Sequence, residues 1–274
     1  MLDSNRLGMP TVNGYPALSF DTRLRLIKES GFQTLILWWG DGEDCDRKER
    51  VRLAEKHGLD IEHAHGSTDA LNALWLPANE GANTVERLKK EIEDCSIYGV
   101  KTLVLHLTNG SHPPDVSEIG IERIAKLVSI AEKEKVNLAF ENIRLPQHLE
   151  TVLARFSGSE RVGFCYDAGH QHYWTKDKDW LLTQKERVFA IHLHDNLGDK
   201  DAHLPPLDGN INWREEISKI THSSYHGSVT LEAEIFDDMM KNSKQEDTEK
   251  LVRIFLENAY QCGMELKKII DETT

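Results

Sequence analysis

The sequence predicts an α/β protein, a single (β/α)8 TIM barrel over residues 1–274, and three observations lead to this fold. Short runs rich in Leu, Ile and Val alternate with segments that carry the hydrophobic spacing of helices. The runs recur at intervals of roughly 25 to 40 residues, as the strands of parallel βαβ units do. Nearly every run after the second ends in His, Asp or Glu, and a closed barrel brings the carboxyl ends of its strands to one rim.

The expected strands are these short apolar runs, and a glycine precedes three of them. Gly31, Gly58 and Gly99 stand where a helix is expected to end, a position that favours glycine. A weaker first strand, which includes Gly8 and Met9, precedes a helix expected at 21–30 and completes the set of eight. The other seven expected strands are 33–39, 59–65, 100–106, 136–141, 162–167, 188–194 and 228–232.

Helical patterns fill the intervals between the runs. Apolar residues recur there every three or four positions, the spacing of a helix that packs one face on a sheet. Asn83 and Glu86 form a capping-box-like start to one such helix. The polar stretch 237–250 is expected to be a long loop before the last helix, and an open, doubly wound sheet is the alternative architecture. The clearest stripes are Val85/Leu88/Ile92/Cys95, Ile121/Ile124/Leu127/Val128/Ala131 and Leu251/Ile254/Phe255/Ala259/Cys262.

Composition narrows the class of protein. The net charge of -13, from 33 Lys+Arg and 46 Asp+Glu, argues against nucleic acid as a partner, because phosphate binding needs clustered bases. The 4 cysteines form no C-x-x-C pair, so neither a disulfide framework nor a cysteine zinc site is expected. The N-terminus lacks a signal-peptide core and no run reaches membrane-spanning length, which predicts a cytoplasmic protein with no membrane partner. A homo-oligomer is compatible with the sequence.

Three carboxylates, Glu141, Asp167 and Glu232, each close an otherwise apolar run. Burying a charge without a partner is costly, and three such charges at one rim repel one another. A divalent metal therefore offers an economical solution, with oxygen ligands favouring Mn, Mg or Co and histidines favouring Zn. An ion-pair network with Arg144 or Lys200 is the alternative. The histidines and other polar residues expected at the same rim are His63, His65, His106, His170, His192, His194, Asp201 and His203.

Together these residues resemble the xylose-isomerase-like barrels, which include endonuclease IV, sugar epimerases of the tagatose and psicose type, and inosose dehydratases and isomerases. The resemblance runs from about Leu59 to Glu232, and its motifs are specific for the superfamily but much less so for an activity. The motifs are Phe140-Glu141-Asn142, Asp167-Ala168-Gly169-His170, His192-Leu193-His194-Asp195, Asp201-Ala202-His203 followed by Gly209-Asn210-Ile211, and Thr230-Leu231-Glu232.

The resemblance implies that Glu141, Asp167, one histidine of the seventh strand and Glu232 form a shared metal site. The endonuclease IV pattern aligns this histidine with His192, the ligand we expect. The epimerase pattern places it at His194 instead, so the choice stays open at this point. The other histidine of the pair is expected to support the site or to meet substrate.

Endonuclease IV binds further metals, and the resemblance extends to their ligands as well. It matches His65 and His106 to one of these metals, and His170 with Asp201 and His203 to another. Two features weigh against a nuclease besides the acidic net charge: no basic run accompanies the site, and Pro-Pro-Leu-Asp-Gly at 205–209 replaces a glycine-flanked acidic turn. In non-nuclease members of the superfamily the same groups can bind substrate hydroxyls.

Three tryptophans near the expected rim bear on the substrate. Trp38 lies in the second strand, Trp75 follows the third strand and Trp174 follows His170. Packing under loops is the alternative role for each of them. Apolar faces above a polar, metal-containing floor suit the C–H face of a sugar or cyclitol, so we expect the three indoles to line the substrate site.

The sequence thus predicts a divalent-metal-dependent isomerase or epimerase of a small sugar, sugar phosphate or cyclitol. The metal (Mn, Zn, Co or Mg) is expected to stabilise an enediolate, while Glu141 and Glu232 remove and return the proton. The alternative is an endonuclease IV-like phosphodiesterase that acts on abasic DNA with a trinuclear zinc site. A non-catalytic, metal-dependent sugar-binding protein is the third hypothesis. Neither the sugar nor the number of metals follows from the sequence.

Overall fold

Eight parallel strands form one sheet, in the order β7-β6-β5-β4-β3-β2-β1-β8, in the computed structural model, which describes residues 2–11, 18–235 and 245–273. The amide of Leu193 donates to the Thr230 carbonyl at 3.0 Å, and the amide of Glu232 donates to the Leu193 carbonyl at 3.0 Å. These bonds join the two edge strands, so the sheet closes into the predicted barrel and the open-sheet alternative is wrong. The strands are β1 (Asp3–Pro10), β2 (Thr34–Trp38), β3 (Asp60–His65), β4 (Thr102–Leu105), β5 (Asn137–Glu141), β6 (Val162–Asp167), β7 (Val188–His192) and β8 (Ser228–Thr230).

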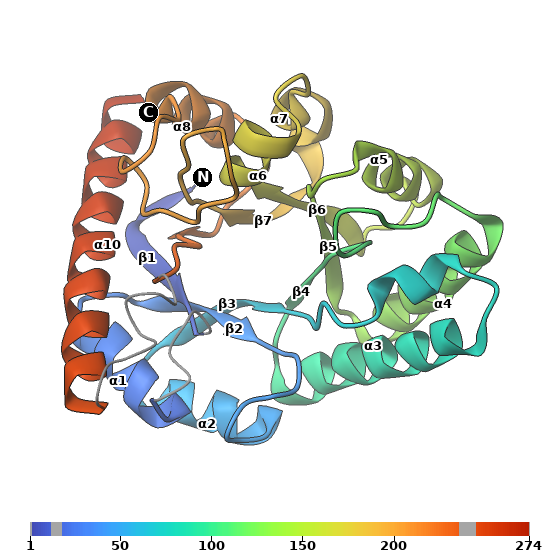
Figure 1. Cartoon of the computed structure of the whole chain (residues 1–274), viewed down its shortest axis with the longest axis horizontal. Coiled ribbons are helices and arrows are strands. Elements are labelled where there is room, and N and C mark those ends of the chain that lie inside the picture. Colours follow the sequence, from blue (N-terminus) through green and yellow to red (C-terminus); the bar gives the residue numbers. More distant parts are fainter. Residues whose placement is uncertain (1, 12–17, 236–244, 274) are drawn as a thin grey trace.

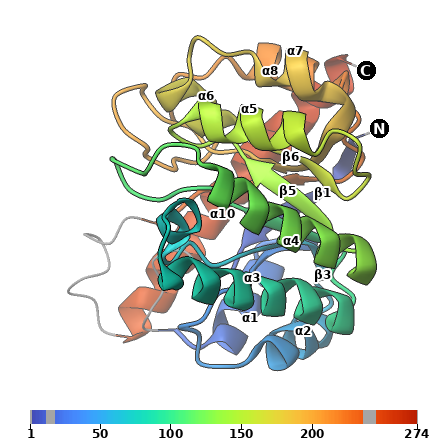
Figure 2. The same ribbon diagram turned by 90° about the vertical axis from the view of Figure 1, so that its right-hand side faces the viewer.

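Helices surround the strands on the outside of the barrel (Figure 1). Figure 2 shows that three of them, α3, α4 and α5, follow one another around that surface. The helices are α1 (Phe20–Glu29), α2 (Arg47–Lys56), α3 (Asn79–Tyr98), α4 (Glu118–Glu134), α5 (Pro146–Arg155), α6 (Ala168–Trp174), α7 (Trp180–Gln184), α8 (Trp213–Thr221) and α10 (Gln245–Thr273), with 3-10 turns η1 (Leu71–Trp75) and η2 (Lys185–Arg187).

Helix ends agree with the sequence in some places and not in others. Gly31, Gly58 and Gly99 all have positive φ angles next to helix ends, as predicted for glycine. The expected start at Asn83 is wrong, because α3 begins four residues earlier at Asn79. The loop expected at 237–250 is partly wrong, since 245–250 belong to α10, while 236–244 lie outside the described residues.

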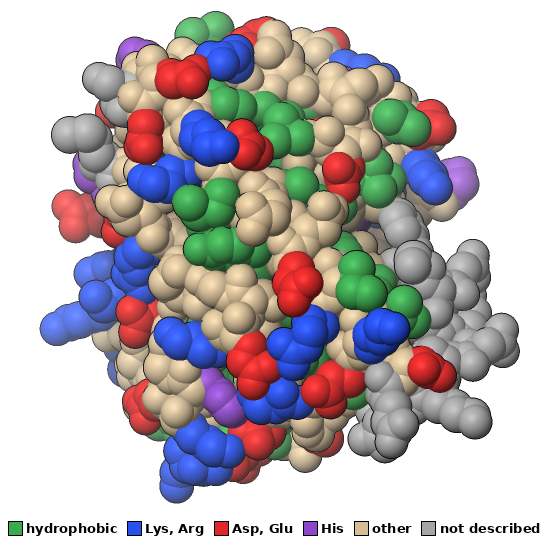
Figure 3. Space-filling view, turned by 90° about the vertical axis from the view of Figure 1, so that its left-hand side faces the viewer, with side chains coloured by type: hydrophobic (Ala, Val, Ile, Leu, Met, Phe, Trp, Pro, Cys, Tyr) green, Lys and Arg blue, Asp and Glu red, His purple; other side chains and the backbone are tan. Residues whose placement is uncertain are grey.

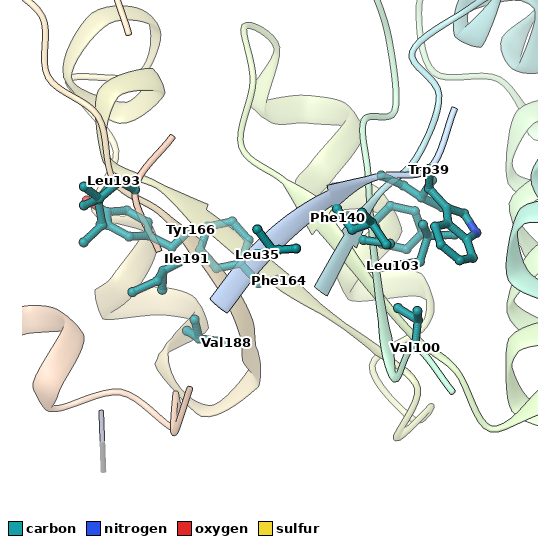
Figure 4. Close-up of a cluster of buried hydrophobic side chains, with 14 of the residues drawn as sticks. Leu35, Trp39, Val100, Leu103, Phe140, Phe164, Tyr166, Val188, Ile191 and Leu193 are labelled. Atoms are coloured by element: carbon teal, nitrogen blue, oxygen red, sulfur yellow. The ribbon is translucent and has the colours of Figure 1, made fainter. Parts of the chain in front are cut away.

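Buried apolar side chains form two layers, one between the strands and the helices and one inside the barrel. The outer layer lies between strands and helices and includes Leu35, Phe140 and Ile191 (Figure 4). Each such fully buried side chain stabilises the fold by about 1.5–3 kcal/mol relative to exposure. The inner layer is a small plug formed by Val104, Ala139, Cys165 and Ala190. Strand residues alternate between the two layers, so the side chains that follow this inner plug point into the barrel mouth.

Strand β7 departs from simple alternation. Its register with β6 shifts between Val188 and Ala190, which makes Phe189 an extra residue. Val188 packs in the outer layer, whereas Phe189 packs against the inner plug. Gly163 leaves room for it, because a Cβ there would lie 2.3 Å from the Phe189 ring. The bulge therefore places Val188 and Ala190 on opposite faces, although strict alternation along the strand would place them on one face, and His192 still points inward.

The outer surface mixes charges of both signs. Figure 3 shows Lys and Arg side chains interspersed with Asp and Glu on one face of the molecule. Arg25 pairs with Glu249 at 2.7 Å, and Arg253 pairs with Glu29 at 2.7 Å. These two ion pairs join α1 to α10. Among the described residues, no helix is both long enough and apolar enough to cross a membrane.

Candidate active site

A cavity of about 290 Å³ opens at the carboxyl ends of the strands. Its floor is polar and its walls include two indole rings, from Trp38 and Trp174. Strand β5 ends at Glu141 and β3 ends at His65, so both residues reach the rim as the last members of their strands. The polar floor consists of His65, His106, Glu141, His170, Asp201, His203 and Glu232.

Four residues form what we call the inner group: Glu141, Asp167, His192 and Glu232. One ligand-type atom of each lies within 4.8 Å of the others. His192 Nδ1 lies 3.1 Å from Glu232 Oε1 and 3.4 Å from Glu141 Oε2. The residues at which the motifs predicted a shared metal site are thus neighbours, and the histidine among them is His192 rather than His194.

A second set, the outer group, comprises His170, His194, Asp201 and His203. Ligand-type atoms of these four also lie within 4.8 Å of one another. Asp201 joins them, with Oδ1 3.4 Å from His203 Nε2 and Oδ2 3.6 Å from His170 Nε2. The rings of His194 and His203 stack with centroids 3.9 Å apart. His194 also reaches Asp167 at 3.1 Å, so the inner and outer groups touch.

A third set, the side group, consists of His65, His106 and Glu141. Glu141 Oε2 lies 3.1 Å from His106 Nε2 and 3.4 Å from His65 Nε2. The other oxygen, Oε1, lies 3.0 Å from His170 Nδ1. Glu141 therefore touches members of all three sets, which makes it the centre of the site.

The charges of the metal-free site balance through protonated imidazoles. Burial opposes ionisation of Glu141, but His106 and His192 outweigh it and hold the pKa of Glu141 well below its usual range. Burial likewise opposes a charge on His203, yet its bond to Asp201 raises the pKa of His203 to about 10. A divalent cation would displace such protons and take over their role.

The donor set fits a divalent cation. Within the described chain, one buried polar atom of each inner-group residue lacks a hydrogen bond of normal geometry: Glu141 Oε1, Asp167 Oδ2, His192 Nδ1 and Glu232 Oε2. An unsatisfied buried polar atom costs about 1–3 kcal/mol, and coordination to a metal would satisfy all four. Three carboxylates and one imidazole are ligands that Mn, Co and Zn accept.

Two residues that support the inner group received no role from the sequence. The Asn142 side chain accepts from the Asp167 amide at 2.7 Å and donates to the Asp167 carbonyl at 2.8 Å, so it holds that backbone in place. His63 Nε2 lies 2.9 Å from His192 Nε2, which leaves His192 Nδ1 facing the carboxylates. The sequence did contain a signal for each of them: Asn142 belongs to the Phe-Glu-Asn motif, and His63 lies two residues before His65 in the same strand.

Asp195 organises the loop that carries Asp201 and His203. Its carboxylate is fully buried and accepts the Trp213 indole N–H at 2.7 Å. It also accepts the amide of Leu207 at 3.0 Å, among other backbone amides of the loop. The backbone of Gly209 approaches the Asp195 carboxylate closely, since a Cβ at Gly209 would lie 2.1 Å from Asp195 Oδ1. The last residue of the His-Leu-His-Asp motif thus shapes a loop rather than binding a ligand.

Of the three tryptophans expected at the substrate site, two line the cavity. Trp38 stacks on His65 with ring centroids 5.7 Å apart, and Trp174 stacks on His170 at 4.6 Å. The prediction for Trp75 is wrong. Its side chain is 2% exposed, and its indole N–H donates to the Leu107 carbonyl at 2.7 Å. The turn η1 directs Trp75 inward, where it packs as a core residue.

Comparison with known proteins identifies relatives by sequence. The family model described as xylose isomerase-like TIM barrel matches residues 24–259. The uncharacterized protein y4fM of Sinorhizobium fredii is 27% identical over 252 residues, which cover 76% of this chain and 79% of that protein. A probable endonuclease 4 of Thermotoga maritima is 30% identical over 151 residues. That match covers 51% of this chain and 50% of the relative, so it spans about half of each.

Solved structures share the fold over nearly the whole chain. An L-ribulose 3-epimerase superposes with a TM-score of 0.72 at 17% identity, covering 99% of this chain and 97% of the other. The D-psicose 3-epimerase of Clostridium cellulolyticum H10, solved with D-tagatose, gives a TM-score of 0.71 at 13% identity, covering 95% and 99%. At such identities the likeness establishes a common barrel.

Proposed function

The chain belongs to the xylose isomerase-like TIM-barrel family, and on this premise we propose that it is a divalent-metal-dependent isomerase or epimerase. Its substrate is a small polyhydroxy carbonyl compound. The observation that carries the proposal is the inner group, a buried cluster in which Glu141 at the end of β5 and Glu232 just after β8 both contact the His192 imidazole, with Asp167 beside them. The sugar epimerases among the solved structures of this fold support it.

The inner group is suited to move a proton between carbon and carboxylate. When bound there, a divalent cation would act as a Lewis acid toward the carbonyl and hydroxyl oxygens of the substrate. Glu141 and Glu232 are ionised in the metal-free protein, because histidines hold both pKa values low despite burial. In our proposal one of them removes the proton from carbon and the other returns it to the opposite face.

The remaining cavity residues orient the substrate. The raised pKa values of His170 and His203, which result from nearby carboxylates despite burial, keep both rings protonated at neutral pH. The Nε2 atoms of both rings face Asp201, so in our proposal the two imidazolium rings and Asp201 together contact the substrate oxygens. Trp38 and Trp174 offer flat apolar faces that suit the C–H surface of a sugar ring or chain and exclude water from the reacting carbon.

Solvent isotope exchange tests the proposal. Protein loaded with Mn²⁺ or Co²⁺ should incorporate deuterium from D₂O next to the carbonyl of at least one ketose, aldose or inosose, and a chelator should abolish the exchange. Glu141→Gln should lower the exchange rate at least about 10³-fold. The matched control Glu160→Gln, an exposed glutamate far from the cavity, should retain it. Exchange that persists in Glu141→Gln would contradict the role proposed for Glu141.

A second candidate activity is cleavage of phosphodiesters at abasic sites by a three-metal cluster. The observation in its favour is that the inner, outer and side groups provide three sets of metal ligands, with Glu141 common to the inner and side groups. Counting metals distinguishes the candidates. About one ion per chain supports the isomerase class, whereas three ions together with nicking of an abasic duplex support the nuclease.

A further inference from the structure

The charges that line the cavity are unequal in sign. Among the described residues of its wall and floor, Arg144 is the sole Lys or Arg, while Glu141, Asp201, Glu232 and Glu234 are acidic. A divalent cation in the inner group would still leave that group's three carboxylates with one negative charge in excess. Apart from the titratable imidazoles of the floor, the cavity therefore has one fixed cation, which lies on its wall.

Arg144 is held in place without being neutralised. Its guanidinium carbon lies 4.2 Å from the centroid of the Trp174 ring, a cation–π contact. One of its N–H groups donates to the Gly110 carbonyl at 3.2 Å. No carboxylate of the described chain forms an ion pair with it at 4.0 Å or less. Since a guanidinium has five N–H groups, most of its donors stay available.

The position of Arg144 relates it to the reacting end of the cavity. Trp174 contacts both the Arg144 guanidinium, whose carbon lies 4.2 Å from the ring centroid, and the His170 ring, whose centroid lies 4.6 Å away. The guanidinium and one member of the outer group are therefore neighbours of the same indole. Both line the same cavity, so one small substrate can contact both.

We infer that Arg144 binds an anionic group at the far end of the substrate, so that the substrate is a phosphorylated or carboxylated sugar rather than a neutral one. The inference rests on the proposed function. A guanidinium matches phosphate and carboxylate with two parallel hydrogen bonds. Arg144 attracts the anionic group to its part of the wall, which leaves the carbonyl end of the substrate facing the inner group.

Paired ligands test this inference. Binding of D-fructose 6-phosphate against D-fructose, D-ribulose 5-phosphate against D-ribulose, and D-glucuronate against D-glucose is measured by calorimetry on Mn²⁺-loaded protein. We expect a charged member to bind more tightly than its neutral partner. Arg144→Gln should weaken that charged ligand about 10- to 100-fold and leave the neutral one within about two-fold. Arg155→Gln, an exposed arginine on α5, is the matched control and should change neither.

Comparison of the sugar phosphates with D-glucuronate shows whether phosphate or carboxylate is the anion that Arg144 binds. Arg144→Lys keeps the charge without the planar fork and should recover part of the lost affinity. The inference is overturned if no charged ligand is preferred, if none binds, or if Arg144→Gln weakens charged and neutral ligands equally. It is also overturned if only an abasic DNA duplex shows dependence on Arg144. Arg144-dependent binding without deuterium exchange would instead refute the proposed reaction alone.

Discussion

The inner and outer groups contain the same kinds of side chain but are positioned by different means. Glu141, Asp167 and His192 are the last residues of β5, β6 and β7, so the hydrogen bonds of the sheet determine where they lie. Asp201 and His203 lie on the loop after β7, and His203 has a positive φ of 42°. Their positions depend on how that loop folds around buried Asp195.

This difference separates two tasks. A site that binds a metal and transfers protons needs atoms fixed to within a fraction of an ångström, and strand ends provide this. A site that fits one substrate among many related ones can change through its loops while the barrel stays the same. The inner group should therefore determine whether the reaction occurs, and the outer group should determine how well a given substrate binds.

The largest effect is expected from an inner-group change. Glu232→Gln keeps the shape of the side chain but removes a charge and a base next to His192. The exchange rate should fall at least about 10³-fold, and affinity for Mn²⁺ should fall about 10- to 100-fold. Both are measured on the same preparations, by deuterium exchange and metal titration. If Glu232→Gln kept full affinity for Mn²⁺ and an unchanged exchange rate, the inner group would not be the set of residues on which the reaction depends.

A change to the loop should affect the outer group and spare the inner one. Asp195→Ala leaves the Trp213 indole N–H and several loop amides without an acceptor. We expect a loss of about 2–4 kcal/mol in the free energy of unfolding and a higher KM. Hydrogen exchange of the amides in 196–212 should become faster, while about one Mn²⁺ per chain is retained. Loss of that ion would show that the inner group depends on the loop.

The outer group should make the stability of the protein depend on pH. The pKa of His203 is raised to about 10 by Asp201 and nearby glutamates in spite of burial. A raised pKa stabilises the folded state fully below about pH 6.5, and the contribution is lost as pH rises through about 10. In metal-free protein, the unfolding free energy of the wild type relative to His203→Gln should therefore decline across this interval by about 4–5 kcal/mol. A difference that does not change with pH would contradict the protonated pair.

The smallest effect on function is expected at Trp75. Because Trp75 packs in the core and its N–H is bonded to Leu107, Trp75→Phe should lower the free energy of unfolding by about 1–2 kcal/mol. KM should stay within about two-fold, since the ring does not line the cavity. Trp174→Phe provides the contrast, with a higher KM and little change in stability. A raised KM in Trp75→Phe would restore the role that the sequence suggested.

The inner group could be anticipated from the sequence because it depends on strand ends. Apolar runs that stop at a carboxylate identify Glu141 and Asp167 without knowledge of neighbours. The choice between His192 and His194 could not be made that way, since residues two apart in a strand share a face. In the structure the two histidines have different neighbours: His192 lies beside Glu232 in the inner group, and His194 lies beside His203 in the outer group.

Features that depend on tertiary packing could not be predicted from the sequence. The bulge at Phe189 depends on the space above Gly163 on the neighbouring strand, which no local pattern of β7 contains. The inward turn of Trp75 depends on η1, whose short length leaves no helical periodicity to detect. Helix α10 begins at Gln245, inside a polar stretch. The sequence did not indicate this start, because the first turn of the helix has no apolar stripe.

We propose that the inner group, with His192 as its histidine, holds the ion on which the reaction depends. Anomalous scattering from crystals prepared with one equivalent of Mn²⁺ tests it most directly. We expect one peak bounded by Glu141, Asp167, His192 and Glu232, with Nδ1 as the histidine ligand. A peak found between His194, Asp201 and His203, with none in the inner group, would contradict it.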